Sequence, residues 1–430
     1  MRPALSQGTM VGMTALGRRT LLKATVASGA AAVVAGGTAT EALADPAGRE
    51  IRIATYNASL NREKAGQLIQ DLSIPVDKQA AAIGEVIQMN RPDIVLINEF
   101  DYDDAHRAAQ LFRANVLEVP QNGQHPITYP YMYTAPVNTG VPTGMDLNHD
   151  GKADGPDDAF GFGLFPGQYG MLILSRFPIL ADHVRTFQKL RWEQMPGNLL
   201  PRDYYGEKAA SILRLSSKSH WDVPVQIDGA VLHVLAMHPT PPSFDGPEKR
   251  NKRRNSDEIR LMADYIAGGK RASYIVDDAG RPGGLDRSAR FVVLGDFNSD
   301  PRDGDSWPGA IQQLLDQPRI QDPKPMSEGA VEASVKQGGA NAAHLSDPRF
   351  DTADFSDTPG PGNIRCDYVL PSRGLKVIGS AVFWPRTGQP GAELTGVAPF
   401  PTSDHRLVRL DLRLPGTPGR GRTTPASLLA

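Results

Sequence analysis

The sequence predicts an α/β protein in which two β-sheets pack face to face and helices flank them. Three observations support this fold class. Apolar runs of strand length recur through the chain. Segments with a helical spacing of apolar residues lie between some of these runs. Long loops, to which 43 glycines and 36 prolines contribute, separate the elements, and no internal repeat is present.

The expected strands are short apolar segments bounded by turn residues. They lie at residues 51–56, 93–98, 170–175, 209–215, 230–237, 291–295, 366–370, 376–384 and 406–413. The spacing of apolar residues predicts helices over residues 77–90, 103–116, 255–266 and 307–315. The first helix ends before Arg91-Pro92, because a proline disfavours helical backbone in the preceding residue.

Three regions lack a regular pattern. Residues 120–168 form an insertion, residues 278–290 a surface loop rich in Gly, Arg and Asp, and residues 416–430 a disordered tail. No shift of composition divides residues 49–415, so we expect one domain over that range. No stretch of the chain is long and apolar enough for a transmembrane segment.

The net charge of the chain argues against a protein that binds nucleic acid mainly through contacts to its phosphates. The formal net charge is −2, and it is about −5 without residues 1–44, which carry four basic residues and one acidic residue. A basic face is expected of such a protein. Cys366 is the single cysteine, so the chain forms no internal disulfide. This is compatible with a protein that folds before export.

The N-terminus predicts export. Arg18-Arg19 precede a mildly apolar run over residues 24–37 and a Glu41-Ala42-Leu43-Ala44 segment. Paired arginines, a weak apolar region and a small-residue cleavage site are typical of a twin-arginine signal peptide, here residues 1–44. We therefore expect a secreted or periplasmic monomer that uses the twin-arginine export machinery. The alternative is a disordered arm with two chance arginines.

Polar side chains stand at the ends of several expected strands. Oxygen ligands of this kind hold a hard divalent cation, and an imidazole stabilises charge or transfers a proton. This combination is what metal-assisted hydrolysis of a phosphate ester requires. The side chains are Asn57, Glu99, His238, Asp296, Asn298, Asp367, Asp404 and His405.

Together, in this order, the segments Thr55-Tyr56-Asn57, Ile97-Asn98-Glu99, Gly295-Asp296-Phe297-Asn298 and Ser403-Asp404-His405 resemble the endonuclease/exonuclease/phosphatase superfamily. The resemblance covers most of the chain after residue 49. It implies the four-layer fold of deoxyribonuclease I, with a two-sheet sandwich between helices, and makes residues 49–415 a catalytic domain.

The resemblance also implies roles for individual residues. Glu99 is the main ligand of a catalytic Mg²⁺ or Mn²⁺, and Asn57 and Asp404 assist it. Asp296 activates the attacking water, and Asn298 contacts the phosphoryl group. Oxygen-only ligands suit a hard cation and disfavour zinc.

Two histidines have different expected roles. Asp367 is a candidate to orient His405 and to favour its imidazolium, which stabilises a pentacovalent phosphate. The resemblance implies that His238 protonates the leaving oxygen. The chain departs from many family nucleases here, because the segment before residues 171–175 has no carboxylate to pair with His238. Tyr169 in that segment is a candidate contact to the phosphate or to the metal ligands instead.

Residues 146–157 resemble the calcium loop of EF-hand and dockerin modules. Gly151 occupies position 6, where the loop turns sharply. No clean helices flank the loop, so an acidic solvated loop is the alternative to a structural Ca²⁺ site. The expected ligands are Asp146, Asn148, Asp150, Asp154 and Asp157.

These patterns predict an exported, metal-dependent phosphoesterase that hydrolyses phosphodiester or phosphomonoester bonds. Nucleic acid is the first expected substrate, and a phospholipid head group or another small organic phosphate is the second. The basic run over residues 249–254 either attracts an anionic substrate or forms a solvated start of a helix. A non-catalytic, calcium-dependent binding module is the alternative from another class, and a broken set of catalytic residues would be its mark.

Overall fold

The structure is a computed structural model that describes residues 48–415. The predicted signal peptide over residues 1–44 and the predicted tail over residues 416–430 lie outside the described residues. No helix of the described part is both long enough and apolar enough to cross a membrane.

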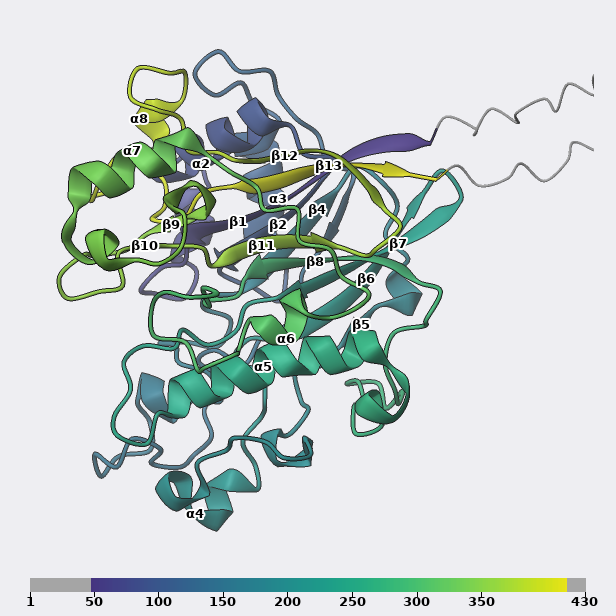
Figure 1. The fold of residues 1–430 in the computed structure, drawn as a ribbon, viewed down its shortest axis with the longest axis vertical. Helices are drawn as coiled ribbons and strands as arrows, with labels where there is room; N and C mark the ends of the chain where they lie inside the picture. Colours follow the sequence, from purple (N-terminus) through teal and green to yellow (C-terminus); the bar gives the residue numbers. More distant parts are fainter. Residues whose placement is uncertain (1–47, 416–430) are drawn as a thin grey trace, which may run out of the picture. The chain divides into compact units, whose positions relative to one another are not determined.

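Two large β-sheets form the centre of the described chain (Figure 1). The first has the order β12-β13-β1-β2-β4-β3. Its strands are Lys376–Val382, Val408–Leu414, Arg49–Leu60, Ile94–Phe100, Met171–Ser175 and Tyr131–Tyr133. The second has the order β11-β8-β7-β6-β5. Its strands are Asp367–Pro371, Arg290–Asp296, Ala230–Met237, His220–Ile227 and Arg185–Thr186. A small ribbon pairs β9, Ala353–Asp354, with β10, Asn363–Ile364.

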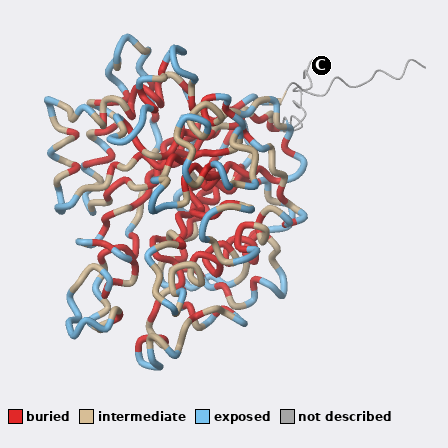
Figure 2. Tube along the Cα trace, turned by 60° about the vertical axis from the view of Figure 1, so that its left-hand side comes forward, coloured by how far each residue is buried: buried red, intermediate tan, exposed pale blue. Residues whose placement is uncertain are grey.

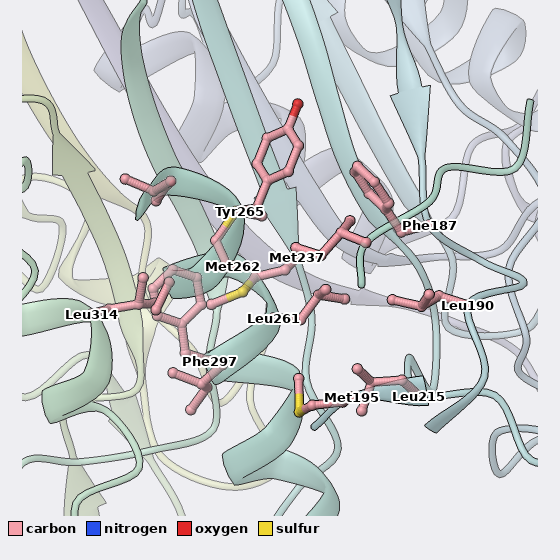
Figure 3. Close-up of a cluster of buried hydrophobic side chains, with 14 of the residues drawn as sticks. Phe187, Leu190, Met195, Leu215, Met237, Leu261, Met262, Tyr265, Phe297 and Leu314 are labelled. Carbon is pink, nitrogen blue, oxygen red and sulfur yellow. The ribbon is translucent and has the colours of Figure 1, made fainter. Parts of the chain in front are cut away.

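Helices cover the outer faces of both sheets. Helix α2, Lys78–Asn90, and helix α3, Arg107–Leu111, pack with the outer side chains of the first sheet. Helix α5, Arg250–Ala267, and helix α6, Gln312–Leu315, pack on the second sheet. Figure 3 shows this second contact, in which Leu261 and Met262 of α5 lie beside Met237 of β7.

The layers therefore run helix, sheet, sheet, helix, and the α/β sandwich predicted from the sequence is confirmed. A third apolar core fills the space between the two sheets. Figure 2 shows buried chain running through the middle of the fold and exposed chain mainly in the peripheral loops.

Alternation along the strands explains why polar groups gather at one end of the sandwich. Side chains on one face of a strand recur every second residue. Ile53 of β1 lies in the core between the sheets, and Asn57 continues the same face four residues later. Leu294 of β8 precedes Asp296 in the same way. Asn98 of β2, His238 after β7 and Asp367 of β11 likewise lie on the face of their strand that points into the core between the sheets.

Strand direction brings these ends to one rim. Strands β1 and β2 are parallel, as are β7 and β8. Strand β11 runs antiparallel to β8 with Asp367 opposite Asp296, and β13 runs antiparallel to β1. The carboxyl ends of four strands and the amino ends of two therefore meet at the same edge, where α/β folds commonly bind ligands.

The helices predicted over residues 77–90 and 255–266 are confirmed as α2 and α5. The segment 103–116 is divided between α3 and a π-helical segment, Phe112–Leu117, and only the end of 307–315 is helical, in α6. The remaining α-helices of the described residues are α1, Gln67–Asp71, α4, Arg202–Ala210, α7, Glu328–Gln337, and α8, Ala392–Thr395.

The prediction of a strand over residues 209–215 is wrong. Helix α4 ends at Ala210, and Leu213 and Leu215 are buried in the core beneath α5 from an irregular segment. The strand that occupies this part of the sheet is β6, in which the core residues Trp221, Val223, Val225 and Ile227 alternate with His220, Asp222, Pro224 and Gln226. The proline lies beyond the short pairing of β5 with Trp221 and Asp222, at the sheet edge that residues 178–180 border through an isolated bridge at Val225.

Candidate active site

Glu99 stands at the end of β2 with both carboxylate oxygens held by amides. Its Oε1 accepts a hydrogen bond from Asn57 Nδ2 at 3.1 Å, and its Oε2 accepts one from Asn61 Nδ2 at 2.6 Å. Burial raises the pKa of this carboxyl, while His405 and Asn57 oppose the shift and Asp404 adds to it. Among the described residues, no lysine or arginine forms an ion pair with Glu99, so a bound cation would relieve its burial.

Asp296 lies at the centre of the rim. Its Oδ1 accepts a hydrogen bond from the Asn298 backbone at 2.8 Å. Its Oδ2 accepts from Asn57 Nδ2 at 3.1 Å and from Asn298 Nδ2 at 3.2 Å. Two imidazoles approach the same oxygen, His238 Nε2 at 3.5 Å and His405 Nε2 at 3.6 Å. Burial raises the pKa of the Asp296 carboxyl, and the neighbouring His405 opposes that shift.

His405 is held by Asp367, as its predicted role requires. The His405 Nδ1 lies 2.8 Å from Asp367 Oδ2, and Thr352 Oγ1 donates to the same carboxylate oxygen at 2.9 Å. Burial alone would lower the pKa of His405, but Asp367 and Asp296 outweigh burial and hold the pKa well above its usual range. His405 is therefore an imidazolium that presents Nε2 to the rim.

His238 has the opposite character. Neither of its ring nitrogens has a hydrogen-bond partner in the described part of the chain. Burial, Lys218 and the charge of His405 all lower its pKa well below the usual range. These effects favour the neutral imidazole, which can donate one N–H group to a substrate oxygen.

Three site residues have a left-handed backbone, which is uncommon for residues other than glycine. The φ angles are 58° at Glu99, 56° at Tyr169 and 51° at Asn298. For Glu99 the left-handed backbone interrupts the alternation of β2, in which Asn98 already occupies the inward face. Unfavourable backbone geometry concentrated at one rim is characteristic of functional sites.

The chemistry of the donors favours Glu99 as the place for a hard cation. Within residues 48–415, one group of three potential ligand types has its atoms within 4.8 Å of one another: Asp296, Cys366 and His405. Burial raises the pKa of the Cys366 thiol well above its usual value, and His405 Nδ1 already binds Asp367. Glu99 offers hard oxygens, as Mg²⁺ requires, and Asp404 lies close enough to affect its pKa.

The structure gives Asn57 a different contact from the one expected of a ligand. Its Nδ2 donates to both Glu99 and Asp296, and its Oδ1 accepts a hydrogen bond from the Ser59 backbone at 3.2 Å. Asn57 thus links the two carboxylates across the sheets. Asp404 receives long hydrogen bonds from Ser59 and Ser403 at 3.5 and 3.4 Å.

The order and geometry of these groups agree with a comparison to known families. The sequence model of the Endonuclease/Exonuclease/phosphatase family matches residues 54–405, which is most of the chain. The chain belongs to this family. Membership supports a phosphoric ester hydrolase in general. Comparison with curated proteins gave no significant match.

Solved structures of this family resemble the chain at low identity. An endonuclease/exonuclease/phosphatase from Beutenbergia cavernae is 19% identical, with 85% of this chain and 72% of that chain covered and a TM-score of 0.48. Sphingomyelinase C from Streptomyces griseocarneus is 16% identical, with 84% and 99% covered and a TM-score of 0.39. A beta toxin mutant from Staphylococcus aureus with bound magnesium ions is 13% identical, with 84% and 99% covered and a TM-score of 0.41.

Lys218 is a buried lysine close to the rim that the sequence did not reveal. It lies just before β6, is only 6% exposed, and is near enough to Glu99 and Asp296 that both affect its pKa. Together with Glu99 and Tyr169 it lines a cavity of about 550 Å³, here called the side pocket. The sequence did not predict a strand at β6, so Lys218, which lies just before it, was not among the predicted site residues.

Glu258 of α5 connects the two segments that carry Lys218 and His238. Its Oε1 accepts a hydrogen bond from the Ser217 backbone and its Oε2 one from the Thr240 backbone, each at 2.6 Å. Glu258 is fully buried. It therefore holds the loop before β6 and the loop after β7 in one arrangement, without contacting the rim itself.

The loop over residues 146–157 lies beside the side pocket. Asp146 accepts hydrogen bonds from the backbones of Asp150 and Gly151 at 3.2 and 2.9 Å, so its carboxylate closes the turn. The buried Asp158 ties the two ends of the loop, accepting from Leu147 and Gly155. Asp157 lines the side pocket. Asn148 accepts from the Asp150 backbone at 3.1 Å, and no hydrogen bond joins the side chain of Asp154 to the other expected ligands.

Proposed function

We propose that the protein is an exported, divalent-metal-dependent phosphoesterase that hydrolyses phosphodiester or phosphomonoester bonds at the rim around Asp296. The observation that carries this proposal is the convergence of two amides and two imidazoles on one buried carboxylate oxygen. A carboxylate fixed by several donors, beside one cationic and one neutral imidazole, is suited to general-base chemistry on a phosphate ester.

The metal would be Mg²⁺ or Mn²⁺, held by Glu99 with Asp404 and, after reorientation of its amide, Asn57. When bound, the cation supplies Lewis-acid polarisation of a phosphoryl oxygen. The Glu99 carboxylate is positioned for this by Asn61.

The side chains around Asp296 have separate catalytic roles. Asp296 accepts the proton of the attacking water, and its burial makes it a stronger base than a solvated carboxylate. Asn298 orients Asp296 and contacts the phosphoryl group. The His405 imidazolium stabilises negative charge on the phosphoryl oxygens, and the neutral His238 donates a hydrogen bond. Tyr169 lines the side pocket, where it can contact the phosphate.

Nucleic acid remains the first substrate class, and a phospholipid head group or another small organic phosphate is the second. The net charge of −2 weighs against long contacts along a duplex. Glu99 of the rim also lines the side pocket, which favours a small or single-stranded substrate.

Export and calcium binding belong to the same proposal. Arg18-Arg19 and the apolar run over residues 24–37 support a twin-arginine signal peptide, and hence a secreted or periplasmic monomer. Asp146 and Asp150 support a structural Ca²⁺ site, because their spacing matches a calcium loop.

Hydrolysis by the purified full chain tests the proposal. The substrates are bis(p-nitrophenyl) phosphate, p-nitrophenyl phosphate, plasmid DNA, RNA and sphingomyelin, each with Mg²⁺, with Mn²⁺ and with a chelator. We expect metal-dependent hydrolysis that falls by about 10²-fold or more in Asp296→Asn. Asp264→Asn changes a buried carboxylate of α5 outside the rim and should retain activity. Hydrolysis of none of these esters with either metal would favour a binding module instead.

A further inference from the structure

The side pocket contains two basic side chains that form no ion pair with an acidic residue of the described chain. Lys218 and Arg254 both line it, and neither forms an ion pair with a described residue. Arg254 Nε donates to the Leu215 carbonyl at 2.9 Å, and its Nη2 donates to the carbonyls of Arg214 and Phe160. No described group accepts a hydrogen bond from Arg254 Nη1 or from the Lys218 ammonium.

Two buried hydroxyls add to this set of unused donors. Ser217 and Thr240 line the side pocket, and neither side-chain oxygen has a hydrogen-bond partner in the described chain. Ser217 is 4% exposed and Thr240 is 9% exposed. Buried polar atoms are almost always partnered in folded proteins, so unpartnered ones at a cavity indicate a ligand.

The basic charge is held in place by the fold. Burial lowers the pKa of Lys218, while Glu258 and Glu99 oppose that shift. Glu258 cannot pair directly with a ligand, because both of its oxygens bind backbone groups. An anion in the pocket would therefore meet Lys218 and Arg254 without first breaking an ion pair. Asp157 lines the same cavity and is the acidic exception apart from Glu99.

The wall of the pocket also presents aromatic surface. Phe162 is 53% exposed and Phe244 is 89% exposed, and both line the cavity. A volume of about 550 Å³ is within the usual range for pockets that bind small organic ligands. Exposed aromatic rings beside basic groups are the combination that binds nucleotide units, by stacking and by contacts to phosphate.

We propose that the side pocket binds a second phosphate group of the substrate, attached to the organic unit next to the bond that is hydrolysed at Asp296. Lys218 and Arg254 bind this phosphate, with Ser217 and Thr240 as further donors. The substrate is then a nucleotide unit with two phosphates, free or at the end of a single strand. This inference rests on the proposed phosphoesterase function and specifies its substrate.

Two chromogenic substrates that differ in one group test the inference. One is thymidine 5′-(p-nitrophenyl phosphate), and the other carries an additional 3′-phosphate. With the full chain and Mg²⁺, we expect kcat/KM to be about tenfold higher or more for the substrate with the second phosphate, the scale of one charge-assisted contact. In Lys218→Met the preference should fall below about threefold.

The matched control is Lys252→Met. It removes the same charge from the basic run over residues 249–254, which includes Arg254, but Lys252 does not line the side pocket. This variant should keep the wild-type preference. Because the preference is a ratio within one variant, a general loss of catalysis in Lys218→Met does not obscure it, and the wild-type comparison stands even if that variant does not fold.

A binding measurement separates this inference from the proposed function. Calorimetric titration of the wild-type protein with thymidine 3′,5′-bisphosphate and with thymidine 5′-monophosphate should show about tenfold tighter binding of the bisphosphate. Equal hydrolysis and equal binding of the paired ligands would overturn the side-pocket inference while leaving the phosphoesterase intact. Tighter binding of the bisphosphate that depends on Lys218, without hydrolysis of either substrate, would support the pocket and overturn the proposed function.

Discussion

Replacing Glu258 by Gln tests whether a buried side chain on α5 positions the catalytic rim. In the native chain, both carboxylate oxygens accept backbone hydrogen bonds at 2.6 Å, from Ser217 and Thr240. Glutamine keeps one acceptor oxygen and turns an NH₂ group toward the other backbone N–H. One buried donor is then left without a partner, which costs about 1–3 kcal/mol of stability.

The expected catalytic effect is larger than the stability loss alone would cause. The segment that loses its hydrogen bond carries either Lys218 or His238. Asp296 and Glu99 affect the pKa of Lys218, and His238 lies 3.5 Å from Asp296. A displacement of about 1 Å in a catalytic group can lower the rate by roughly 10²-fold. We therefore expect kcat of Glu258→Gln to fall by about 10- to 100-fold at saturating metal.

Asp257→Asn is the matched control on the same helix. Asp257 is buried and its Oδ2 accepts hydrogen bonds from Trp192 Nε1 and the Leu199 backbone, each at 2.6 Å, but these partners lie outside the rim. The loss of charge should cost about 1–2 kcal/mol. The assay is the hydrolysis of bis(p-nitrophenyl) phosphate beside urea unfolding. Glu258 does not position the rim if Glu258→Gln is destabilised as expected yet keeps kcat within threefold of wild type. The same conclusion follows if Asp257→Asn loses as much kcat as Glu258→Gln.

Three further predictions concern stability and export. Burial raises the pKa of Asp351 to about 9, with Asp300 adding to the shift, so the folded chain holds a proton there that the unfolded chain releases near pH 4. Stability should therefore fall as the pH rises between these values, and Asp351→Asn should raise the melting temperature at pH 8 more than at pH 5; an equal effect at both values would contradict this. Calcium at a hundred times its Kd should stabilise the wild type by about 2.7 kcal/mol but not Asp150→Ala, and an unchanged wild-type melting curve would exclude the site. Replacing Arg18 and Arg19 by Lys should abolish export, measured as protein outside the cytoplasm, and undiminished export would exclude the twin-arginine pathway.

Much of the rim could be predicted because polar residues follow apolar runs at the ends of the strands. Asp296 and Glu99 each follow several apolar residues, and a carboxylate there is costly unless it is paired or binds a ligand. The alternation rule adds Asn98, whose Oδ1 accepts a hydrogen bond from the Asp296 backbone at 3.2 Å. That contact joins the two sheets. The alternation of side chains along β2 is enough to predict that Asn98 faces the other sheet.

The side pocket could not be predicted in the same way. Lys218 lies before β6, a strand that was not predicted although Trp221, Val223, Val225 and Ile227 alternate along it. Glu258 lies in a helix predicted correctly, but its partners are backbone groups of two distant loops, and no side-chain pattern reports such contacts. Asn61, which binds Glu99, follows the end of β1 in a segment without periodicity.

The electrostatic difference between the two histidines also required the structure. In the sequence both follow or precede a strand and both have plausible catalytic roles. Folding places Asp367 2.8 Å from His405 and leaves both ring nitrogens of His238 without a hydrogen-bond partner among the described residues. The resulting pKa shifts have opposite directions, which assigns the charge to His405 and neutrality to His238.

The most direct test of the central claim is a metal titration of hydrolysis in Glu99→Gln, with His405→Ala for comparison and circular dichroism as the folding control. Removing the Glu99 charge should raise the Mg²⁺ or Mn²⁺ concentration needed for half-maximal activity by tenfold or more, roughly the effect of losing one charged ligand. His405→Ala should leave that concentration nearly unchanged and lower kcat by about 10²-fold or more. A folded Glu99→Gln enzyme with wild-type metal dependence, or a His405→Ala enzyme with near-normal kcat, would contradict the account.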